Sequence, residues 1–336
     1  ELVRVLGAGG FGITYLGFDH NLDKQVAIKE YLPRELATRI DGSTVAPHSS
    51  GDQSDFEWGL DRFLEEARVL ARFDHPNIIK VYRFFRNHGT GYIVMDYAEG
   101  ESLSAYLGRQ GTITEPQLRG ILMPVLSGLN VIHSGDVLHR DIKPGNIMIR
   151  TDGTPVLIDF GAARQAMNNK SMSVTSIVTP GYAPIEQYST KGNQGPWTDI
   201  YALGAVGYRC LMGHTPEDAT DRILDDEMVP AVEAAKGKAS PEFLAALDAA
   251  LAVREADRPQ TIPEWIEMFG EVPENVLSMG GGRSRVSETS RLNVTSGEPK
   301  SGGGGGKTGL FVGLGLLVAA GLGAGGYFAL GGGGTD

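Results

Sequence analysis

The chain has 336 residues, of which 41% are hydrophobic and 21% are charged, and its formal net charge is −11. This length allows two ordinary domains, or one large two-lobed unit with appended segments. The acidic balance excludes a general electrostatic attraction for nucleic acid or anionic lipid. The single cysteine, Cys210, excludes an internal disulfide and a multi-cysteine metal site.

The first hundred residues alternate short β-branched or aromatic runs with turns. Strands are expected at 25–29, 78–82 and 92–95. The chain also begins inside an expected strand at Glu1, so we expect a trimmed N-terminus. Residues 55–73 instead have helical period, with an apolar stripe of Leu60, Phe63, Ala67, Leu70 and Ala71. This third of the chain is predicted to be a sheet with one long helix.

Helical patterns dominate from about residue 101 to 270, and we expect helices over 118–133, 199–212, 241–253 and 263–269. A sheet-rich first third followed by a mainly helical half indicates an α+β protein with two lobes. Residues 30–54 join a strand to the long helix and include the polar run 41–55. We interpret this connection as a flexible insertion.

The composition changes beyond the helical region. Residues 278–306 are mostly Gly, Ser, Thr and charged residues, which indicates a flexible linker. Residues 309–334 contain no charge, and the apolar stretch 310–330 has about the length that crosses a bilayer of roughly 30 Å. A buried core helix is the alternative, but glycines weaken helices in water and are well tolerated in membranes. Lys300 and Lys307 precede this stretch, which places the globular part in the cytoplasm.

Gly7, Gly9 and Gly12 form a G-x-G-x-x-G motif. The motif alone is weak, because dinucleotide-binding folds use the same spacing. In those folds it opens a helix, whereas residues 13–17 look like a second strand. A glycine hairpin is therefore predicted, and its backbone could lie directly over phosphates.

Lys29 ends the otherwise apolar strand Val26-Ala27-Ile28-Lys29. An ordinary edge lysine is one reading of this pattern. However, Glu66 falls on the margin of the helical apolar stripe, where a carboxylate is costly to bury unless it is paired. The pattern therefore favours an ion pair between Lys29 and Glu66.

Residues 139–146 read His-Arg-Asp-Ile-Lys-Pro-Gly-Asn between apolar flanks. So many polar groups together form either a surface turn or a reactive site. Asp159 follows the expected buried strand 155–158, and a carboxylate there, with Asn146 as a second oxygen donor, suits a hard cation such as magnesium. A nucleotide's phosphates could then lie between the metal and Lys29.

In this order, the glycine motif, VAIK (26–29), Glu66, HRDIKPGN (139–146), DFG (159–161) and TPGYAPIEQ (179–187) resemble the signature set of protein kinases. The resemblance covers roughly residues 1–270 and implies a bilobal fold, with a sheet-rich N-lobe and a mostly helical C-lobe. The lysine at position 143 resembles the sequence that the serine/threonine branch of the family carries in this motif. A membrane-tethered kinase of this plan resembles the bacterial receptor-type, eukaryotic-like (Hanks-type) serine/threonine kinases.

The resemblance also implies roles for individual residues. Asp141 would accept the proton of the substrate hydroxyl, and Lys143 would steady the transferring phosphoryl group. Asn146 and Asp159 would hold Mg²⁺, with Mn²⁺ as an alternative, and Asn146 is counted among the catalytic residues. ATP would be bound by Gly7, Gly9, Gly12, Ala27, Lys29, Glu66, Asp96, Ala98 and Asp159.

Further expectations concern the segment after DFG. Arg140 would receive a phosphate placed there by autophosphorylation, on Ser171, Ser173, Thr175 or Ser176. Arg258 would pair with Glu186, and Asp199 resembles the aspartate of a long central helix. His139, Phe160 and Leu70 would be packing residues. The usual A-P-E motif reads Pro184-Ile185-Glu186 and the valine after the third glycine is Thr14, so the chain departs from the family pattern at these positions.

We therefore predict a catalytic domain over 1–270, with an N-lobe of about 1–97 and a C-lobe of about 98–270. A juxtamembrane linker (271–308), one transmembrane helix (309–331) and the start of a truncated outside segment (332–336) follow. Expected partners are protein substrates with serine or threonine acceptors, membrane lipid and a second copy in a homodimer, but not nucleic acid. The expected location is the inner cell membrane. The alternatives are a pseudokinase scaffold that binds nucleotide without turnover and a small-molecule kinase of related fold.

Overall fold

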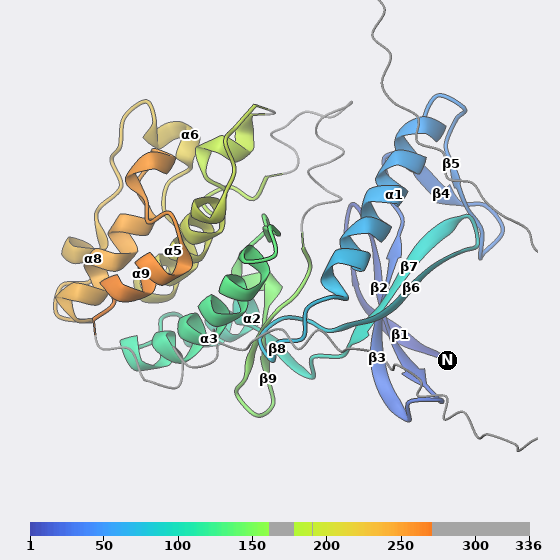
Figure 1. Ribbon diagram of the computed structural model, residues 1–336, viewed down its shortest axis with the longest axis horizontal. Coiled ribbons are helices and arrows are strands. Elements are labelled where there is room, and N and C mark those ends of the chain that lie inside the picture. The colour runs from blue at the N-terminus through green and yellow to red at the C-terminus, as the bar shows by residue number, and fades with distance from the viewer. Residues whose placement is uncertain (161–177, 190, 271–336) are drawn as a thin grey trace, which may run out of the picture. The chain divides into compact units, whose positions relative to one another are not determined.

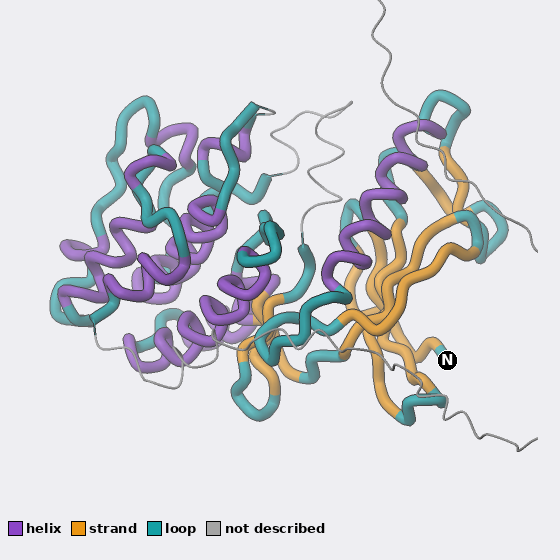
Figure 2. Tube along the Cα trace, viewed as in Figure 1, coloured by secondary structure: helices purple, strands orange, loops and turns teal. Residues whose placement is uncertain are grey.

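The computed structural model describes residues 1–160, 178–189 and 191–270, which belong to one compact unit. Most of its strands gather in one lobe and most of its helices in the other (Figures 1 and 2). This arrangement confirms the predicted α+β class with two lobes. The expected transmembrane helix lies outside the described residues, and no helix within them is long and apolar enough to cross a membrane.

The N-lobe is built on an antiparallel sheet with strand order β1-β2-β3-β7-β6. Its strands are β1 (Leu2–Ala8), β2 (Gly12–Asp19), β3 (Lys24–Tyr31), β6 (Val81–Asn87) and β7 (Thr90–Asp96). Helix α1 (Gln53–Leu70) packs against β6 and β7 (Figure 1). The predicted apolar stripe is buried from Leu60 to Leu70, but Ala71 is exposed because the helix has already ended.

The connection between β3 and α1 is an ordered hairpin, and the prediction of a flexible insertion was wrong. It contains β4 (Ala37–Arg39) and β5 (Val45–Pro47), which pair antiparallel. The connection also contains apolar side chains, and Leu32, Ala37 and Val45 among them are buried. Burial of these side chains offsets the entropy of ordering the segment.

The C-lobe contains the small sheet β10-β9-β8, with β8 (Gly100–Ser102), β9 (Ile147–Arg150) and β10 (Pro155–Leu157). Its longer helices are α2 (Leu103–Gln110), α3 (Glu115–His133), α5 (Pro196–Met212), α8 (Pro241–Ala250) and α9 (Ile262–Met268). Short elements are η1 (Pro144–Asn146), η3 (Ile185–Tyr188), α6 (Ala219–Arg222), α7 (Ala231–Ala234) and η4 (Glu255–Asp257). Helix α5 packs against α3 and α8, and its side chains are buried almost throughout (Figure 1).

Two predicted elements differ from the structure. Helix α8 ends at Ala250 rather than at residue 253, and beyond its end the carbonyl oxygens of Ala252 and Val253 accept hydrogen bonds from the Arg258 guanidinium, both at 2.7 Å. The predicted strand 78–82 is divided between two sheets. Its first part bridges β10 of the C-lobe in parallel, and β6 of the N-lobe begins only afterwards.

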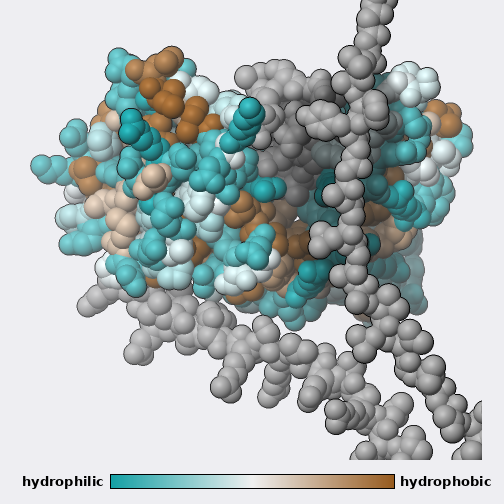
Figure 3. Space-filling model, turned by 45° about the horizontal axis from the view of Figure 1, so that its top comes forward, coloured by the Kyte–Doolittle hydropathy of each residue, from teal (hydrophilic) through white to brown (hydrophobic). Residues whose placement is uncertain are grey.

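Hydrophobic side chains gather on the surface of the C-lobe near α6 (Figure 3). The exposed fractions of Ile223, Leu224 and Val229 are 56%, 86% and 51%. Leu224 is thus the most exposed large hydrophobic residue of the described part of the chain.

Candidate active site

A cavity of about 250 Å³ brings the two lobes' predicted site residues together. The N-lobe supplies the glycine-rich loop (residues 7–12), Lys29 and Glu66, and the C-lobe supplies its polar lining residues Asp141, Asn146 and Asp159. The glycines provide a wall of backbone, while the charged groups lie opposite. Lys143, Ala27, Asp96 and Ala98, which were also predicted, do not line this cavity.

Sheet register places Lys29 in the middle of the N-lobe sheet. Its partners across the sheet are Thr14 on β2 and Ile93 on β7. Its Nζ lies 3.0 Å from Oδ1 of Asp159. Glu66 lines the same cavity from α1, so the geometry is compatible with the Lys29–Glu66 pair, which stays a prediction.

Three described residues donate hydrogen bonds to the Asp141 carboxylate. Lys143 Nζ lies 3.0 Å from it, the Asn146 amide nitrogen 2.9 Å, and the Thr179 hydroxyl 3.2 Å. Lys143 Nζ also lies 3.3 Å from the Thr179 hydroxyl oxygen. Hydrogen bonds from an ammonium and an amide stabilise the charged carboxylate, which is the form that can accept a proton. Thr179, which begins the TPGY motif, was not among the predicted catalytic residues.

Two residues of the candidate site have a strained backbone. Arg140 has φ of 68° and Asp159 has φ of 56°, a left-handed conformation that is unfavourable for residues other than glycine. Such strain persists only where neighbouring contacts over-determine the conformation. For Arg140 that contact comes from the Asp199 carboxylate, which accepts the Arg140 N–H.

Asp199 on α5 anchors the catalytic loop (residues 139–146) through its backbone. Its two carboxylate oxygens accept the N–H groups of His139 and Arg140, each at 2.8 Å. His133 Nε2 lies 2.8 Å from the same carboxylate. Complete burial alone would raise the pKa of Asp199, but hydrogen bonds from His133 and Arg140 and the nearby histidines lower it below the ordinary value. The anchor is therefore ionised at neutral pH.

His139 has the packing role that the sequence predicted. Its ring is buried and lies 4.3 Å from the Phe160 ring, centroid to centroid. Its Nε2 lies 3.0 Å from the Ile158 carbonyl oxygen. Burial lowers the pKa of His139, so the ring is neutral near pH 7 and joins the catalytic loop to the residues before Gly161.

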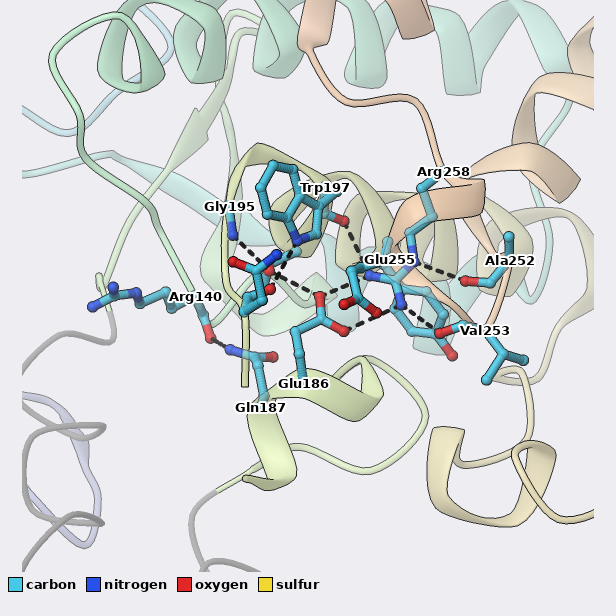
Figure 4. A network of polar contacts seen from close by, with 12 residues as sticks. Arg140, Glu186, Gln187, Gly195, Trp197, Ala252, Val253, Glu255 and Arg258 are labelled. Atoms are coloured by element: carbon cyan, nitrogen blue, oxygen red, sulfur yellow. Dashed lines mark hydrogen bonds and ion pairs between the residues drawn. The ribbon is translucent and has the colours of Figure 1, made fainter. Parts of the chain in front are cut away.

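A second buried network contacts the catalytic loop at Arg140 (Figure 4). Arg258 pairs with Glu186 at 2.8 Å, and both side chains are almost fully buried, which confirms the predicted pair. Thr198 donates to the same carboxylate at 2.9 Å. Gln187 then donates from its amide nitrogen to the Arg140 carbonyl oxygen at 2.8 Å. The altered Pro184-Ile185-Glu186 motif therefore keeps its anchor.

Asp96 and Ala98, two of the residues predicted to bind ATP, lie at and just after the end of β7. The Asp96 N–H already donates to the Lys80 carbonyl oxygen at 2.8 Å, so the group that this residue could offer to a base is its own carbonyl oxygen. Burial alone would raise the pKa of Asp96, but hydrogen bonds from Tyr82 and Arg150, both 2.6 Å long, lower it. The Asp96 side chain therefore holds the end of β7 in place through its bonds to Tyr82 and Arg150.

Asn146 and Asp159 fit a small oxygen-binding cation. The Ile158 N–H donates to the Asn146 backbone carbonyl at 2.9 Å, so the two segments run side by side. The Asn146 amide nitrogen donates to Asp141, which leaves its Oδ1 for a metal ion, and Asn146 and Asp159 line the same cavity. Two protein oxygens suit Mg²⁺, which usually takes its remaining ligands from phosphates and water. The described residues contain no group of three or more His, Cys, Asp or Glu side chains that is arranged to hold a metal ion.

Comparison with known proteins agrees with this geometry. A sequence model of the protein kinase domain matches residues 1–266. Serine/threonine-protein kinase PknA of Nostoc sp. is 32% identical over 278 residues, which cover 80% of this chain and 46% of that protein. PknL of Mycobacterium tuberculosis, also a serine/threonine-protein kinase, is 32% identical over 75% of this chain and 60% of its own length. This chain thus spans about half of these relatives.

Among solved structures, the apo form of PpkA-294 has 42% sequence identity and a TM-score of 0.75. The match covers 80% of this chain and 95% of that one. The fold, the cavity and the sequence matches agree with one another. The chain belongs to the protein kinase domain family, and its relatives include bacterial serine/threonine kinases.

Proposed function

We propose that this chain is a serine/threonine protein kinase that transfers the γ-phosphate of ATP to hydroxyl groups of proteins. The observation that carries the proposal is the Asp141 carboxylate, which is bonded to Lys143, Asn146 and Thr179 next to the cavity that Lys29 and Asp159 also line. Family membership implies ATP and a divalent metal, and we propose Mg²⁺.

Each group in the site has a task that matches its contacts. Asp141 orients the acceptor hydroxyl and takes up its proton, which requires the ionised carboxylate. Lys143 and Lys29 place positive charge near the transferring phosphoryl group, where negative charge is spread over its oxygens. The bound metal, coordinated by Asn146 and Asp159, would supply further charge neutralisation at the phosphates. Catalysis in this proposal rests on positioning and electrostatics.

The test is phosphate transfer from ATP–Mg²⁺ to a generic protein substrate such as myelin basic protein, followed by phosphoamino-acid analysis. We expect phosphoserine or phosphothreonine, and Asp141→Asn should lower kcat by about 10²- to 10⁴-fold while the fold is kept. Asp74→Asn, which alters an exposed surface pair with Lys80, serves as the matched control. Nucleotide binding without transfer would favour the scaffold alternative, and transfer only to small molecules would favour the small-molecule kinase.

We also propose autophosphorylation in the segment that contains Ser171, Ser173, Thr175 and Ser176, which lies outside the described residues. Its support is Arg140, whose buried Nε has no hydrogen-bond partner among the described residues. A phosphate is an acceptor of the kind that a guanidinium binds most strongly. Phosphosite mapping after incubation with ATP–Mg²⁺ tests this, and an active enzyme with an unmodified segment would contradict it.

Membrane attachment through residues 309–331 is a separate proposal that is supported by the sequence alone. These residues carry no charge and are long enough to cross a bilayer. The same reasoning proposes the inner cell membrane, with the kinase domain on the cytoplasmic side. Full-length protein should stay in the membrane fraction after alkaline carbonate extraction, and a chain ending at residue 270 should be released. The proposed homodimer is tested by sedimentation velocity of both forms.

A further inference from the structure

The chain that follows β3 is bonded to the tip of the glycine-rich loop, residues 7–12. The Leu32 N–H donates to the Phe11 carbonyl oxygen at 3.0 Å, and the Arg34 N–H donates to the Gly10 carbonyl oxygen at 2.9 Å. These bonds continue the pairing of β2 and β3 beyond the end of both strands. All six residues of the glycine-rich loop line the catalytic cavity, so the contact reaches the nucleotide site from outside.

The approach between the two segments is close. A Cβ atom placed on Gly12 would lie 2.1 Å from the Glu30 carbonyl oxygen, which is far inside van der Waals contact. Glycine is therefore required at position 12 by its neighbour on β3, and not only by a ligand. The backbones of the loop and of the following segment are thus in direct contact.

The β4–β5 hairpin, defined here as residues 32–48, is itself fixed by a buried polar cluster. Arg39 on β4 pairs with Glu30 on β3 at 2.5 Å, and the Glu30 side chain is 1% exposed. The hydroxyl groups of Tyr15 and Tyr92 also donate to Glu30, each at 2.8 Å. Burial, and then the hydrogen bond and charge of Glu30, raise the pKa of Tyr15 to about 12, so Tyr15 remains a donor across the physiological range.

Three further contacts tie the same region to the rest of the N-lobe. The Tyr31 ring packs at 5.3 Å from the Phe56 ring on α1, and the Thr90 hydroxyl donates to the Tyr31 carbonyl oxygen. The Val45 N–H donates to the His88 carbonyl oxygen at 2.8 Å, in the turn between β6 and β7. The hairpin is therefore a fixed support, and the glycine-rich loop is bonded to it through backbone groups.

We infer that the β4–β5 hairpin is a positioning element of the nucleotide site, which holds the glycine-rich loop over the cavity before the nucleotide binds. Ordering a glycine-rich segment has a large entropic cost. If the loop is already ordered in the free protein, less of this cost falls on binding, and affinity is higher. The inference rests on the proposed function only for the identity of the ligand, ATP.

Arg34 allows a sharp test because its side chain is exposed and its contribution is a single N–H group. The Leu36 and Ala37 N–H groups both donate to the Pro33 carbonyl oxygen, so Arg34 is the second residue of a turn, where proline is favoured. Arg34→Pro suits the turn, removes the N–H group and places the ring Cδ against the Gly10 carbonyl oxygen, so the loop has to move away from the hairpin. Arg34→Ala removes the same side chain, keeps the N–H group and is the matched control.

The first measurement is the dissociation constant of the non-hydrolysable analogue AMP-PNP with Mg²⁺, which does not depend on phosphate transfer. Loss of this hydrogen bond and displacement of the loop should weaken binding at least about fivefold in Arg34→Pro and leave Arg34→Ala like the parent. In turnover, KM for ATP should rise by a similar factor, while kcat and KM for the protein substrate stay unchanged. Equal affinity of both variants and the parent, or tighter binding by Arg34→Pro, would overturn the inference.

A second measurement uses the parent protein, so it holds even where Arg34→Pro fails to fold. Coupling between two sites is reciprocal. AMP-PNP with Mg²⁺ should therefore slow hydrogen exchange in peptides that contain Leu32 and Arg34, and unchanged exchange there would refute the coupling.

His48→Ala, which removes the exposed imidazole 3.0 Å from the Arg34 carbonyl oxygen, should weaken AMP-PNP binding about twofold. Parent-like affinity in His48→Ala would count against the hairpin as a support. Failure of phosphate transfer in an otherwise normal binder would contradict the proposed function and leave this inference standing.

Discussion

The catalytic loop of the C-lobe and the glycine-rich loop of the N-lobe contribute to the same cavity but are held by different kinds of contact. The catalytic loop is bonded to a buried carboxylate, because Asp199 accepts the N–H groups of His139 and Arg140. The glycine-rich loop has almost no side chains and is bonded through its carbonyl oxygens to Leu32 and Arg34. One loop is fixed by charge inside the core, and the other by backbone pairing at the surface.

This difference matches what each loop has to do. Asp141 must be placed within a fraction of an ångström of its target, since small misplacements of reacting groups lower rates strongly. A buried ionised anchor gives such precision, because removing one partner leaves an uncompensated charge. The glycine-rich loop has to admit and release a nucleotide, and neutral backbone bonds of about 1 kcal/mol each can open without unfolding the lobe. We expect the two kinds of anchor to respond differently to mutation.

The largest effect should come from the buried ion pair of the C-lobe. Arg258→Ala leaves the Glu186 carboxylate buried and unpaired, so the free energy of unfolding should fall by about 3–5 kcal/mol. In the N-lobe, Arg39→Ala should be milder, at about 2 kcal/mol, because Glu30 keeps two tyrosine donors and Arg39 is itself 26% exposed. Urea denaturation of both variants measures the difference. A larger loss in Arg39→Ala than in Arg258→Ala would reverse the comparison.

A somewhat smaller effect should separate chemistry from binding. Asp199→Asn weakens the anchor of the catalytic loop, because an amide presents one acceptor oxygen to the two N–H groups. We expect kcat to fall about 100-fold through misplacement of Asp141, while the affinity for AMP-PNP with Mg²⁺ changes less than about twofold. This is the opposite pattern to that of Arg34→Pro. Parallel losses of kcat and nucleotide affinity would mean that the two loops are not held independently.

The smallest expected effect is a dependence of stability on pH through buried histidines. Burial lowers the pKa of His139 and of His75, whereas in the unfolded chain both titrate near the ordinary value of about 6.5. As pH falls below about 6.5, the unfolded chain takes up protons first, so stability is full above this pH and decreases below it. The loss should not exceed about 1.4 kcal/mol per pH unit for each histidine. Urea denaturation between pH 7 and 5 measures it, and His75→Gln should reduce the slope.

Much of the candidate site could be predicted because its residues are local in sequence. Asp141, Lys143 and Asn146 lie within one short segment, and their mutual hydrogen bonds need only that segment's turn. The long helix α1 and the helices α3, α5 and α9 were expected within a few residues of their observed limits, since each has a continuous apolar face. Motif order then indicated the arrangement of the lobes, which the fold confirms.

The missed features depend on contacts between distant segments. Thr179 joins Asp141 across a gap in sequence that no periodicity reveals. The polar composition after residue 40 suggested flexibility. It does not reveal the buried cluster that fixes the hairpin, in which Arg39 pairs with Glu30 and Tyr92 donates to Glu30 from a distant strand.

The sequence by itself determined the α+β class, the bilobal plan and the chemical character of the site, because periodicity, glycine spacing and short polar motifs act over a few residues. Only the tertiary structure decided which groups meet. It brought Lys29 to Asp159, placed Arg258 on Glu186 inside the core, and turned the insertion into a hairpin bonded to the glycine-rich loop. The physical reason is that burial and pairing energies depend on neighbours that folding supplies, and no single segment carries that information.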